Sequence, residues 1–364
     1  MKRKININKT IILCLIIFYI ISILSISSSL TYLSSEFSNL VIKQTIFYLL
    51  GISLIIIITK IGNDFFIRYS KYIYLLNVFL LLLVLLIGDK TNGIKAWFYI
   101  PIFGSFQPSE FMKIGLILFL SYVIKNAKNN NDSDIKIIFK ALIITIIPSV
   151  LTFLEPDTGA VIVYFVILFT ILFVSGIKIK WFIYFIFVGI IGMGFILYLY
   201  FYQKNFFVNI FGSSLFYRLD RIFDFVNLNG MQLTNSIISI SSSGIFGHGI
   251  NNIPIYFPEL QTDFIFASFT SCFGLLGSII LIITIFIFDK EIINIGKKKK
   301  DNINKYITSC VVSVLIYQQV QNISMTIGLL PITGITLPFI SYGGSSLISF
   351  MILIGIILNV QKEK

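Results

Sequence analysis

The sequence has little charge. Asp, Glu, Lys and Arg make up 12% of its 364 residues, against about 25% in a typical soluble domain. Hydrophobic residues account for 57% of the chain, and the mean hydropathy is +0.93. So few charged residues do not cover a water-facing surface. The shortage excludes an ordinary soluble globular protein and predicts an all-α polytopic membrane protein.

Histidine and cysteine are also scarce. The one histidine, His248, excludes a multi-histidine metal site, and its Gly-His-Gly setting is typical of a turn. Cys14, Cys272 and Cys310 lie within apolar stretches and have no motif spacing. This placement favours packing against lipid or helices over a disulfide framework.

Long apolar stretches are abundant, and each stretch of about 20 residues is enough to cross a bilayer as a helix. The interruption Glu155-Pro156-Asp157 divides residues 135–177 into two spans joined by a tight polar turn. We therefore predict a single membrane domain, 1–364, with a long extracytoplasmic loop at about 204–263, between spans seven and eight. The ten predicted spans are 11–33, 41–59, 72–88, 111–124, 135–154, 159–177, 181–203, 264–288, 306–330 and 338–360.

The basic residues predict the orientation. The net charge is +12, but the Lys and Arg residues flank the apolar spans and form no patch, which argues against a nucleic-acid partner. With the N-terminus inside, 21 of the 28 basic residues are cytoplasmic. The positive-inside rule then places both termini in the cytoplasm. The run Lys297–Lys300 has two interpretations, a topology signal or a site for anionic lipid headgroups.

Three predicted outer segments are rich in Gly, Pro and polar residues: 88–110, the turn 155–159 and the loop 204–263. Long ordered loops are usually functional, so we expect the chemistry on this side. Asp263 immediately precedes a long charge-free span. It is either a helix N-cap or a carboxylate at the membrane boundary that acts as a general base.

The other candidates also have alternative roles. Lys113 follows Glu110 by three residues, which suits a helix-face ion pair, but a lysine within a span also suits phosphate binding. Arg218 and Arg221 are solvated loop charges or further phosphate ligands. Trp97 is an interfacial residue or a sugar-stacking platform. Glu155 and Asp157 are expected to keep their turn in water. Gly343 and Gly344 are expected within the last span, where small residues let helices approach.

Five segments together carry a resemblance to a known family. They are QPSEFMK (107–113), PDTG (156–159), residues 232–249, TDFIFA (262–267) and GLLPITGITLPFISYGGSS (328–346). In this order they resemble the SEDS proteins (shape, elongation, division and sporulation), which include RodA, FtsW and SpoVE. The stretches SFQPSEFMKI and MTIGLLPITGI are more similar to RodA than to FtsW.

The resemblance implies a peptidoglycan glycosyltransferase. Such a protein polymerises lipid II at the outer face of the bacterial cytoplasmic membrane, together with a class B penicillin-binding protein. The family's essential aspartate falls on Asp263, our candidate base. Lys113, helped by Arg218 or Arg221, would stabilise the pyrophosphate leaving group. The remaining residues of the family's substrate site fall on Glu110, Asn92, Gly93 and Trp97, and we add Asp157. A divalent cation, Mg²⁺ or Mn²⁺, is compatible with this chemistry but has no motif here.

The chain departs from the family pattern in two places. Ser271 and Cys272 stand where the family usually has two acids, and Ala96 precedes Trp97 where Arg or Ser is common. Two other functions stay open at this point. One is a lipid II flippase, which an intramembrane lysine would suit. The other is a non-catalytic scaffold of the cell-wall synthase, which the missing acids would suit.

Overall fold

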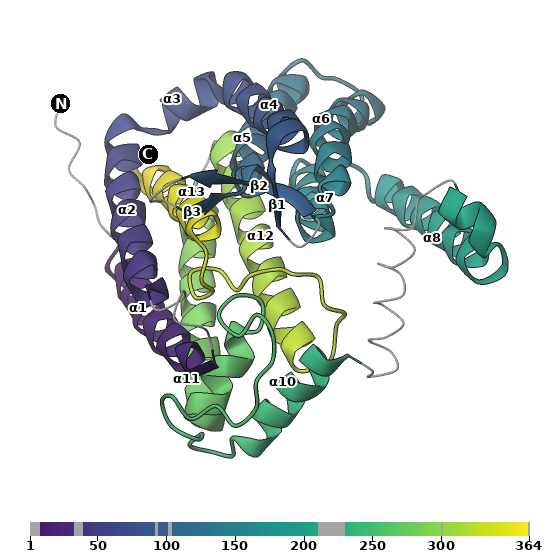
Figure 1. Cartoon of the computed structure of the whole chain (residues 1–364). Helices are drawn as coiled ribbons and strands as arrows, with labels where there is room; N and C mark the ends of the chain where they lie inside the picture. Colours follow the sequence, from purple (N-terminus) through teal and green to yellow (C-terminus); the bar gives the residue numbers. More distant parts are fainter. Residues whose placement is uncertain are drawn as a thin grey trace.

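The computed structural model describes residues 8–32, 39–91, 94–100, 104–209, 230–299 and 301–362. These residues form a bundle of long helices with a small sheet (Figure 1). In chain order the elements are α1 (Lys9–Ser29), η1 (Leu30–Tyr32), α2 (Leu40–Ile61), α3 (Asn63–Arg68), α4 (Ser70–Ile87), β1 (Asp89–Thr91), β2 (Ile94–Ile100), β3 (Gly104–Phe106), α5 (Pro108–Asn129), α6 (Asp134–Leu154), α7 (Thr158–Val174), α8 (Ile179–Tyr202), α10 (Met231–Ser242), α11 (Ile265–Lys297), α12 (Asn302–Thr326) and α13 (Gly344–Lys362).

Seven helices in the described part of the chain are long and apolar enough to cross a membrane: α1, α2, α4, α6, α8, α11 and α13. Helix α7 is apolar but shorter, at 17 residues. The protein is therefore a multi-pass, mainly helical membrane protein. The division of 135–177 into two helices is confirmed, because α6 ends at Leu154 and α7 begins at Thr158. The ten-span topology stays a prediction.

Helix α13 lies inside the bundle, closely packed on α2. A Cβ on Gly51 would lie 2.6 Å from Met351 Cγ, and one on Gly344 would lie 2.8 Å from the Phe47 ring. These glycines permit the close approach of the two helices. The predicted span 338–360 is wrong at its start, because α13 begins at Gly344 and residues 327–343 are not helical. Pro331 and Pro338 supply no N–H to a helix, which explains the irregular backbone.

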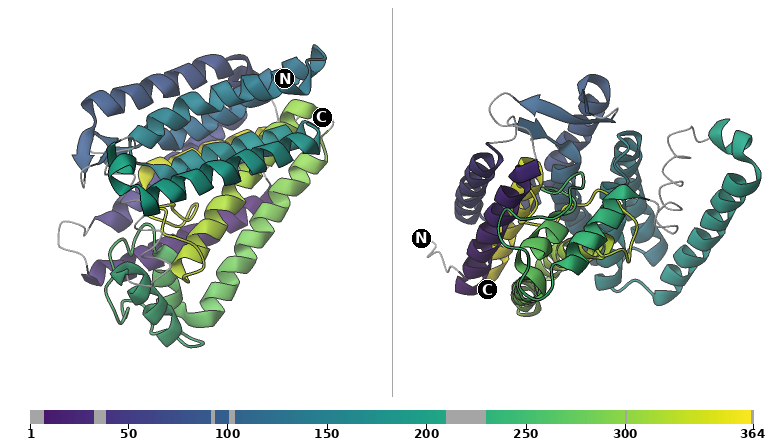
Figure 2. Two further views of the ribbon diagram at one scale, coloured as in Figure 1. Left: turned by 90° about the vertical axis from the view of Figure 1, so that its right-hand side faces the viewer. Right: turned by 60° about the horizontal axis from the view of Figure 1, so that its bottom comes forward.

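Helix α8 lies apart from the rest of the bundle (Figures 1 and 2). Leu199 is its one buried residue among those described. Ring contacts of Phe182 and Phe185 with Phe173 and Phe169 join its first turns to α7. A helix that is apolar on every side and contacts protein mainly at its first turns requires lipid around the rest of its length. The apolar composition of α8 therefore agrees with its position apart from the bundle.

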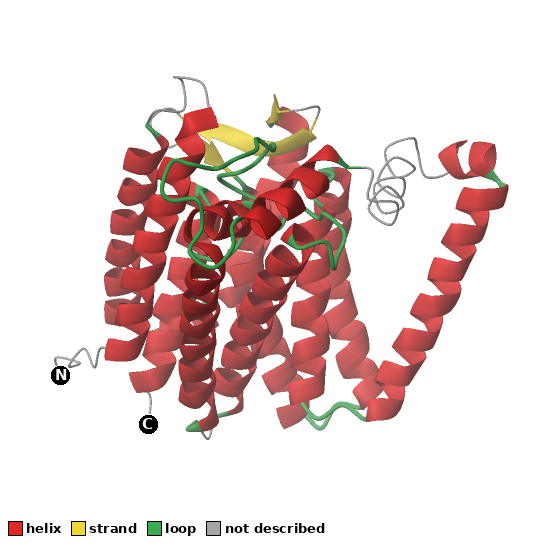
Figure 3. Cartoon of the chain, turned by 90° about the horizontal axis from the view of Figure 1, so that it is seen from below, coloured by secondary structure: helices red, strands yellow, loops and turns green. Residues whose placement is uncertain are grey.

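The sheet, α10 and several loops gather at one end of the bundle, and both ends of the described chain lie at the other (Figure 3). Strand β2 pairs antiparallel with both β1 and β3. Phe106 of β3 stacks on Phe98 of β2 and on Phe111 of α5, with ring centroids 6.5 and 4.8 Å apart. These rings fix the sheet over the start of α5.

Helix α11 is broken at Gly274, whose φ of 64° and ψ of −160° are not helical. The break leaves backbone groups without helical partners, and in a bilayer such groups must find partners within the protein. Residues 244–249 supply them. Four hydrogen bonds join the two segments: His248 N to Ser271 O, Gly249 N to Cys272 O, Leu275 N to Gly244 O and Leu276 N to Ile245 O, at 2.9–3.1 Å. The loop between α10 and α11 is thus attached directly to the broken helix.

Candidate active site

The carboxylate of Asp157 joins the start of α7 to the start of α5. Its Oδ1 accepts the backbone N–H of Ala160 at 3.0 Å, which makes Asp157 the N-cap of α7. Its Oδ2 accepts hydrogen bonds from Gln107 Nε2 and Ser109 Oγ, both at 3.0 Å. Tyr164 of α7 donates to the carbonyl of Ser109 at 2.9 Å. Asp157 is therefore part of a polar network and does not simply keep its turn in water.

The predicted ion pair of Lys113 and Glu110 is confirmed. Lys113 Nζ lies 2.6 Å from Glu110 Oε2, one turn along α5. The lysine is only 1% exposed, and its ammonium group lies 4.5 Å from the centroid of the Phe350 ring in α13. Ser349 also donates to Glu110 Oε2, at 3.2 Å. A buried charge is tolerated only when it is paired in this way.

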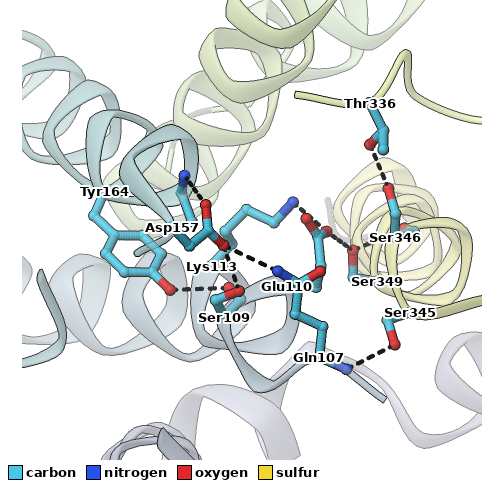
Figure 4. A network of polar contacts seen from close by, with 11 residues as sticks. Gln107, Ser109, Glu110, Lys113, Asp157, Tyr164, Thr336, Ser345, Ser346 and Ser349 are labelled. Atoms are coloured by element: carbon cyan, nitrogen blue, oxygen red, sulfur yellow. Dashed lines mark hydrogen bonds and ion pairs between the residues drawn. The ribbon is translucent and has the colours of Figure 1, made fainter. Parts of the chain in front are cut away.

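The first turn of α13 completes this network (Figure 4). Ser345 Oγ accepts the backbone N–H of Gln107 at 2.9 Å. Ser346 Oγ lies 2.9 Å from Thr336 Oγ1, in the irregular segment that precedes α13. Serines 345, 346 and 349 therefore connect α5 with the segment that runs beside Asp263.

The backbone around Asp263 is held by that same irregular segment. Tyr342 N donates to Gln261 O at 2.8 Å, and Ser341 Oγ donates to Thr262 O at 2.7 Å. Asn322 Nδ2 of α12 bridges the carbonyls of Asp263 and Ile335, at 2.8 and 2.7 Å. The side chain of Asp263 points towards Gly334, where an added Cβ would lie 3.7 Å from Oδ2.

The helix-cap interpretation of Asp263 is wrong. Phe264 is the N-cap residue of α11, and no side chain caps this helix. The hydroxyl of Thr262 bonds to Glu259 instead. Long-range contacts hold the backbone of residues 261–263 instead, and the Asp263 carboxylate lies beside Gly334.

The surroundings of Asp263 suit a general base. Burial raises its pKa to about 7, and the negative charges of Glu259 and Asp157 add to the effect. A base is most effective when its pKa lies near the working pH. The segment that contacts Asp263 also contacts the start of α7, because a Cβ on Gly159 would lie 3.0 Å from Thr333 O. Residues 333–336 thus lie between Asp263 and the network of Asp157, Glu110 and Lys113.

Glu155 corrects a second expectation. It was predicted to keep its turn in water, but its side chain is 0% exposed. Neither carboxylate oxygen has a hydrogen-bond partner among the described residues. Burial raises its pKa to about 9, and the nearby charge of Asp157 contributes. Glu155 is therefore neutral at pH 7. Burial also raises the pKa of Asp157, but the hydrogen bond from the Ala160 N–H opposes this effect.

Other predicted residues are not joined to this cluster. Trp97 lies on β2, half-buried and opposite Asp89, and no hydrogen bond or ring contact among the described residues links it to Asp263 or Lys113. Arg218, Arg221, Asn92 and Gly93 lie outside the described residues. Nor does that part of the chain group three His, Cys, Asp or Glu side chains so that they could hold a metal ion.

Several residues of the cluster were missed from the sequence. Gln107, Ser109, Tyr164, Asn322 and Ser349 supply its hydrogen bonds. Uncharged side chains in or beside apolar helices give little local signal. The one available signal was the density of amides near Asn322 in α12, where Gln318, Gln319 and Gln321 are also buried.

The fold and the site define a polytopic helical membrane protein with a cluster of acids and one buried lysine towards one end of its bundle. A family model for cell cycle proteins of the FtsW, RodA and SpoVE type matches residues 8–364. The chain belongs to this family, which is the SEDS family of the resemblance.

Relatives and solved structures agree. The chain is 34% identical to a probable peptidoglycan glycosyltransferase FtsW of Buchnera aphidicola subsp. Schizaphis graminum, over 88% of this chain and 90% of the relative. It is 30% identical to the stage V sporulation protein E of Bacillus subtilis, over 88% and 86%. A chain of a solved peptidoglycan synthase complex has the same fold, with a TM-score of 0.78, 23% identity and coverage of 98% of both chains.

Proposed function

We propose that this protein is a peptidoglycan glycosyltransferase that joins lipid II disaccharide units into glycan strands. The carrying observation is Asp263, a carboxylate with a pKa near 7 whose side chain lies beside Gly334, in the segment that Thr336 joins to Ser346 of α13. Membership of the family and the glycosyltransferase names of its relatives support the same reaction class. The partner would be a class B penicillin-binding protein, since a structural neighbour is a chain of a synthase complex.

We assign proton transfer to Asp263 and stabilisation of the leaving group to Lys113. A hydroxyl of the acceptor sugar attacks the anomeric carbon of the donor, and Asp263 takes the hydroxyl proton as general base. The bond from that carbon to the undecaprenyl pyrophosphate oxygen breaks, and the pyrophosphate leaves with the electron pair. Lys113 is 1% exposed, so it would stabilise the leaving group through its positive charge within the site and not by direct contact. Asp157 and Glu110 hold α5, α7 and α13 in the arrangement that positions the lysine.

The site would face the outside of the cytoplasmic membrane. The charge pattern supports this orientation. Lys297–Lys299 lie at the end of the bundle opposite Asp263, because α11 runs from one to the other. The positive-inside rule assigns such an end to the cytoplasm. Both termini then lie inside, which agrees with the even number of spans in the predicted topology.

The first test compares wild type with Asp263→Asn in lipid II polymerisation. The purified protein is assayed with its cognate penicillin-binding protein while transpeptidation is blocked. Loss of the base should lower the rate by at least about 100-fold. The matched control is Glu259→Gln, which removes an exposed carboxylate four residues away and should polymerise normally. Equal glycan from Asp263→Asn and wild type would refute the assignment.

The pH profile gives a second prediction for the same residue. Because the base must be unprotonated, the polymerisation rate should rise with pH through about 7 and then level off. Glu259→Gln removes a negative neighbour that raises the pKa of Asp263, so its midpoint should move to lower pH. A midpoint unchanged in Glu259→Gln, or a profile without a step near pH 7, would contradict this role. A flippase would instead move labelled lipid II across vesicles without making glycan, and a scaffold would do neither.

A further inference from the structure

Residues 337–343, just before α13, form a non-helical segment inside the bundle. Inside a bilayer, the carbonyls of such a segment cannot rely on water, so they need donors from the protein. The side chains that supply these donors therefore show what holds the segment in place. Four of its residues are at most 4% exposed: Leu337, Phe339, Ile340 and Ser341.

The side chain of Gln44, in α2, holds this segment at two points. Gln44 is fully buried. Its Nε2 donates to Ser341 O at 3.2 Å and to Ser22 Oγ of α1 at 3.1 Å. Its Oε1 accepts the backbone N–H of Gly343 at 3.4 Å. One amide thus binds the backbone on both sides of Tyr342. An apolar side chain of the same size would leave a buried carbonyl and a buried N–H without these partners.

The backbone of Phe339 shows that α1 and α2 impose the shape of this segment. Its φ of 66° is left-handed, which is uncommon for a residue with a Cβ and persists only where the surroundings fix it. The hydroxyl of Tyr48, about one turn along α2 from Gln44, donates to Phe339 O. The Phe339 ring stacks on that of Phe18 in α1, with centroids 5.8 Å apart.

The other side of the segment holds the backbone beside Asp263. The hydroxyl of Ser341 donates to Thr262 O at 2.7 Å, while the carbonyl of Ser341 accepts from Gln44. The next N–H along the segment donates to Gln261 O at 2.8 Å. Two residues, Ser341 and Thr262, therefore connect Gln44 with Asp263. A shift of the segment on its α2 side would be passed to the neighbours of Asp263.

We propose that Gln44 is a positioning residue, which fixes the place of Asp263 in the site through residues 337–343. Gln44 acts through Ser341 and not on the reacting atoms. The placement of a base matters because a displacement of about 1 Å can lower a rate about 100-fold. The inference rests on the proposed role of Asp263 as the base. The hydrogen bonds of the segment do not depend on that role, so the two proposals can fail separately.

The kinetic test compares wild type with Gln44→Leu, each in complex with the penicillin-binding protein while transpeptidation is blocked. The leucine keeps the approximate volume but removes the donor and the acceptor. We expect kcat for lipid II polymerisation to fall about 30–100-fold, with little change in KM. The matched control is Thr45→Val, on the same helix. The Thr45 hydroxyl bonds to Tyr19 and Val41 and not to the segment, so this variant should polymerise normally.

The pH profile separates positioning from a simple loss of folded protein. Burial raises the pKa of Asp263, and the charges of Glu259 and Asp157, which also raise it, stay unchanged in Gln44→Leu. A backbone released towards water should therefore move the midpoint of the rate to lower pH, by about 0.5 unit or more. Loss of folded protein would lower the rate at every pH without moving the midpoint. A midpoint unchanged or higher in Gln44→Leu would overturn the proposal.

Hydrogen exchange tests the connection without any assay of the reaction. Peptides that cover 258–266 and 337–345 should exchange at least about tenfold faster in Gln44→Leu than in wild type or Thr45→Val. Peptides of α7 should exchange as in wild type, which verifies the fold. Unchanged exchange at 258–266 would overturn the proposal. Normal polymerisation by Asp263→Asn would refute the proposed function alone, and faster exchange in Gln44→Leu would still support the connection to Asp263.

Tyr48→Phe provides a milder variant that keeps the proposal testable if Gln44→Leu does not fold. It removes one hydroxyl and leaves Phe339 O without that donor. We expect kcat to fall about 3–10-fold, with faster exchange at 258–266 and a midpoint at lower pH. A Tyr48→Phe protein with wild-type exchange and a wild-type profile would count against control of Asp263 by α2.

Discussion

Helices α5 and α8 are of similar length, but their surroundings differ. Helix α5 has 22 residues, of which 13 are buried, including Lys113. Helix α8 has 24 residues, of which Leu199 alone is buried. The more polar helix is therefore the more enclosed one. In water the opposite would hold, but in a bilayer the charged groups need protein partners, whereas apolar side chains are equally stable against lipid.

The largest expected difference comes from a lysine on each helix. Lys113→Met leaves the half-buried Glu110 with only Ser349 as a partner, which should cost about 3 kcal/mol of stability and lower polymerisation by about 10²–10³-fold. Lys180→Met, on α8, loses only an exposed contact 5.5 Å from the Trp181 ring and should change stability by less than about 1 kcal/mol. Thermal unfolding in detergent and polymerisation assays measure both. Similar losses in the two variants would show that burial does not distinguish these helices.

Glu155 tests whether a carboxylate buried without a hydrogen-bond partner lowers the stability of the folded protein. Its pKa is about 9 in the folded protein and 4.5 ordinarily, so the folded state binds the extra proton between these values. Stability contributed by this group should therefore fall as pH rises from about 4.5 to 9. Glu155→Gln should remove that slope and stabilise the protein at pH 8 by on the order of 3 kcal/mol.

The control for this effect is Glu259→Gln, which changes the same charge at an exposed position. Its unfolding temperature should stay within a few degrees of that of wild type at pH 8, because the only buried group it affects there is Asp263, whose pKa shift is smaller than that of Glu155. At pH 5 all three proteins should unfold within a few degrees of one another. A Glu155→Gln protein that is less stable than wild type at pH 8 would mean that the carboxylate has a favourable partner.

The smallest effect should have opposite signs on the two helices. A Cβ on Gly115 of α5 would lie 3.1 Å from Asn77 Nδ2 and 3.3 Å from Tyr74 Cα. Gly115→Ala should therefore cost about 1–3 kcal/mol through overpacking. Gly192 of α8 has nothing within 4 Å, so Gly192→Ala should stabilise the helix by up to about 1 kcal/mol. The unfolding temperatures of the two variants test this prediction. A lower unfolding temperature in both would indicate that α8 packs against protein.

The sequence predicts those features that depend on neighbours along the chain. Lys113 and Glu110 pair as expected because residues three apart share one helix face. The separation of α6 from α7 follows from the polar turn between them. The assignment of the family's essential aspartate to Asp263 stays a prediction, and the local interpretation of Asp263 as a helix cap was wrong. The contacts that orient it come from Asn322 and from residues 335–342, far along the chain.

The sequence also did not predict which polar groups are buried. Nothing in the turn Glu155-Pro156-Asp157 indicates that the first acid is enclosed and the second is hydrogen-bonded, because both outcomes depend on how α5 and α7 meet. The break in α11 was missed for a similar reason. A single glycine, Gly274, gives a weak local signal, and its partners are contributed by a loop about 25–30 residues earlier.

The attachment of that loop to α11 requires a particular residue at some positions and accepts any residue at others. Ser271 and Cys272 contribute carbonyl oxygens, which every amino acid carries, whereas Gly247 and Gly274 leave space that no side chain can occupy, since an added Cβ would lie 2.3–2.4 Å from backbone atoms. Residue identity is thus fixed at the glycines and free at the acceptors. The replacement of two acids at 271 and 272 therefore leaves the anchorage of the loop intact. Divergence at these positions says nothing, by itself, against an active enzyme.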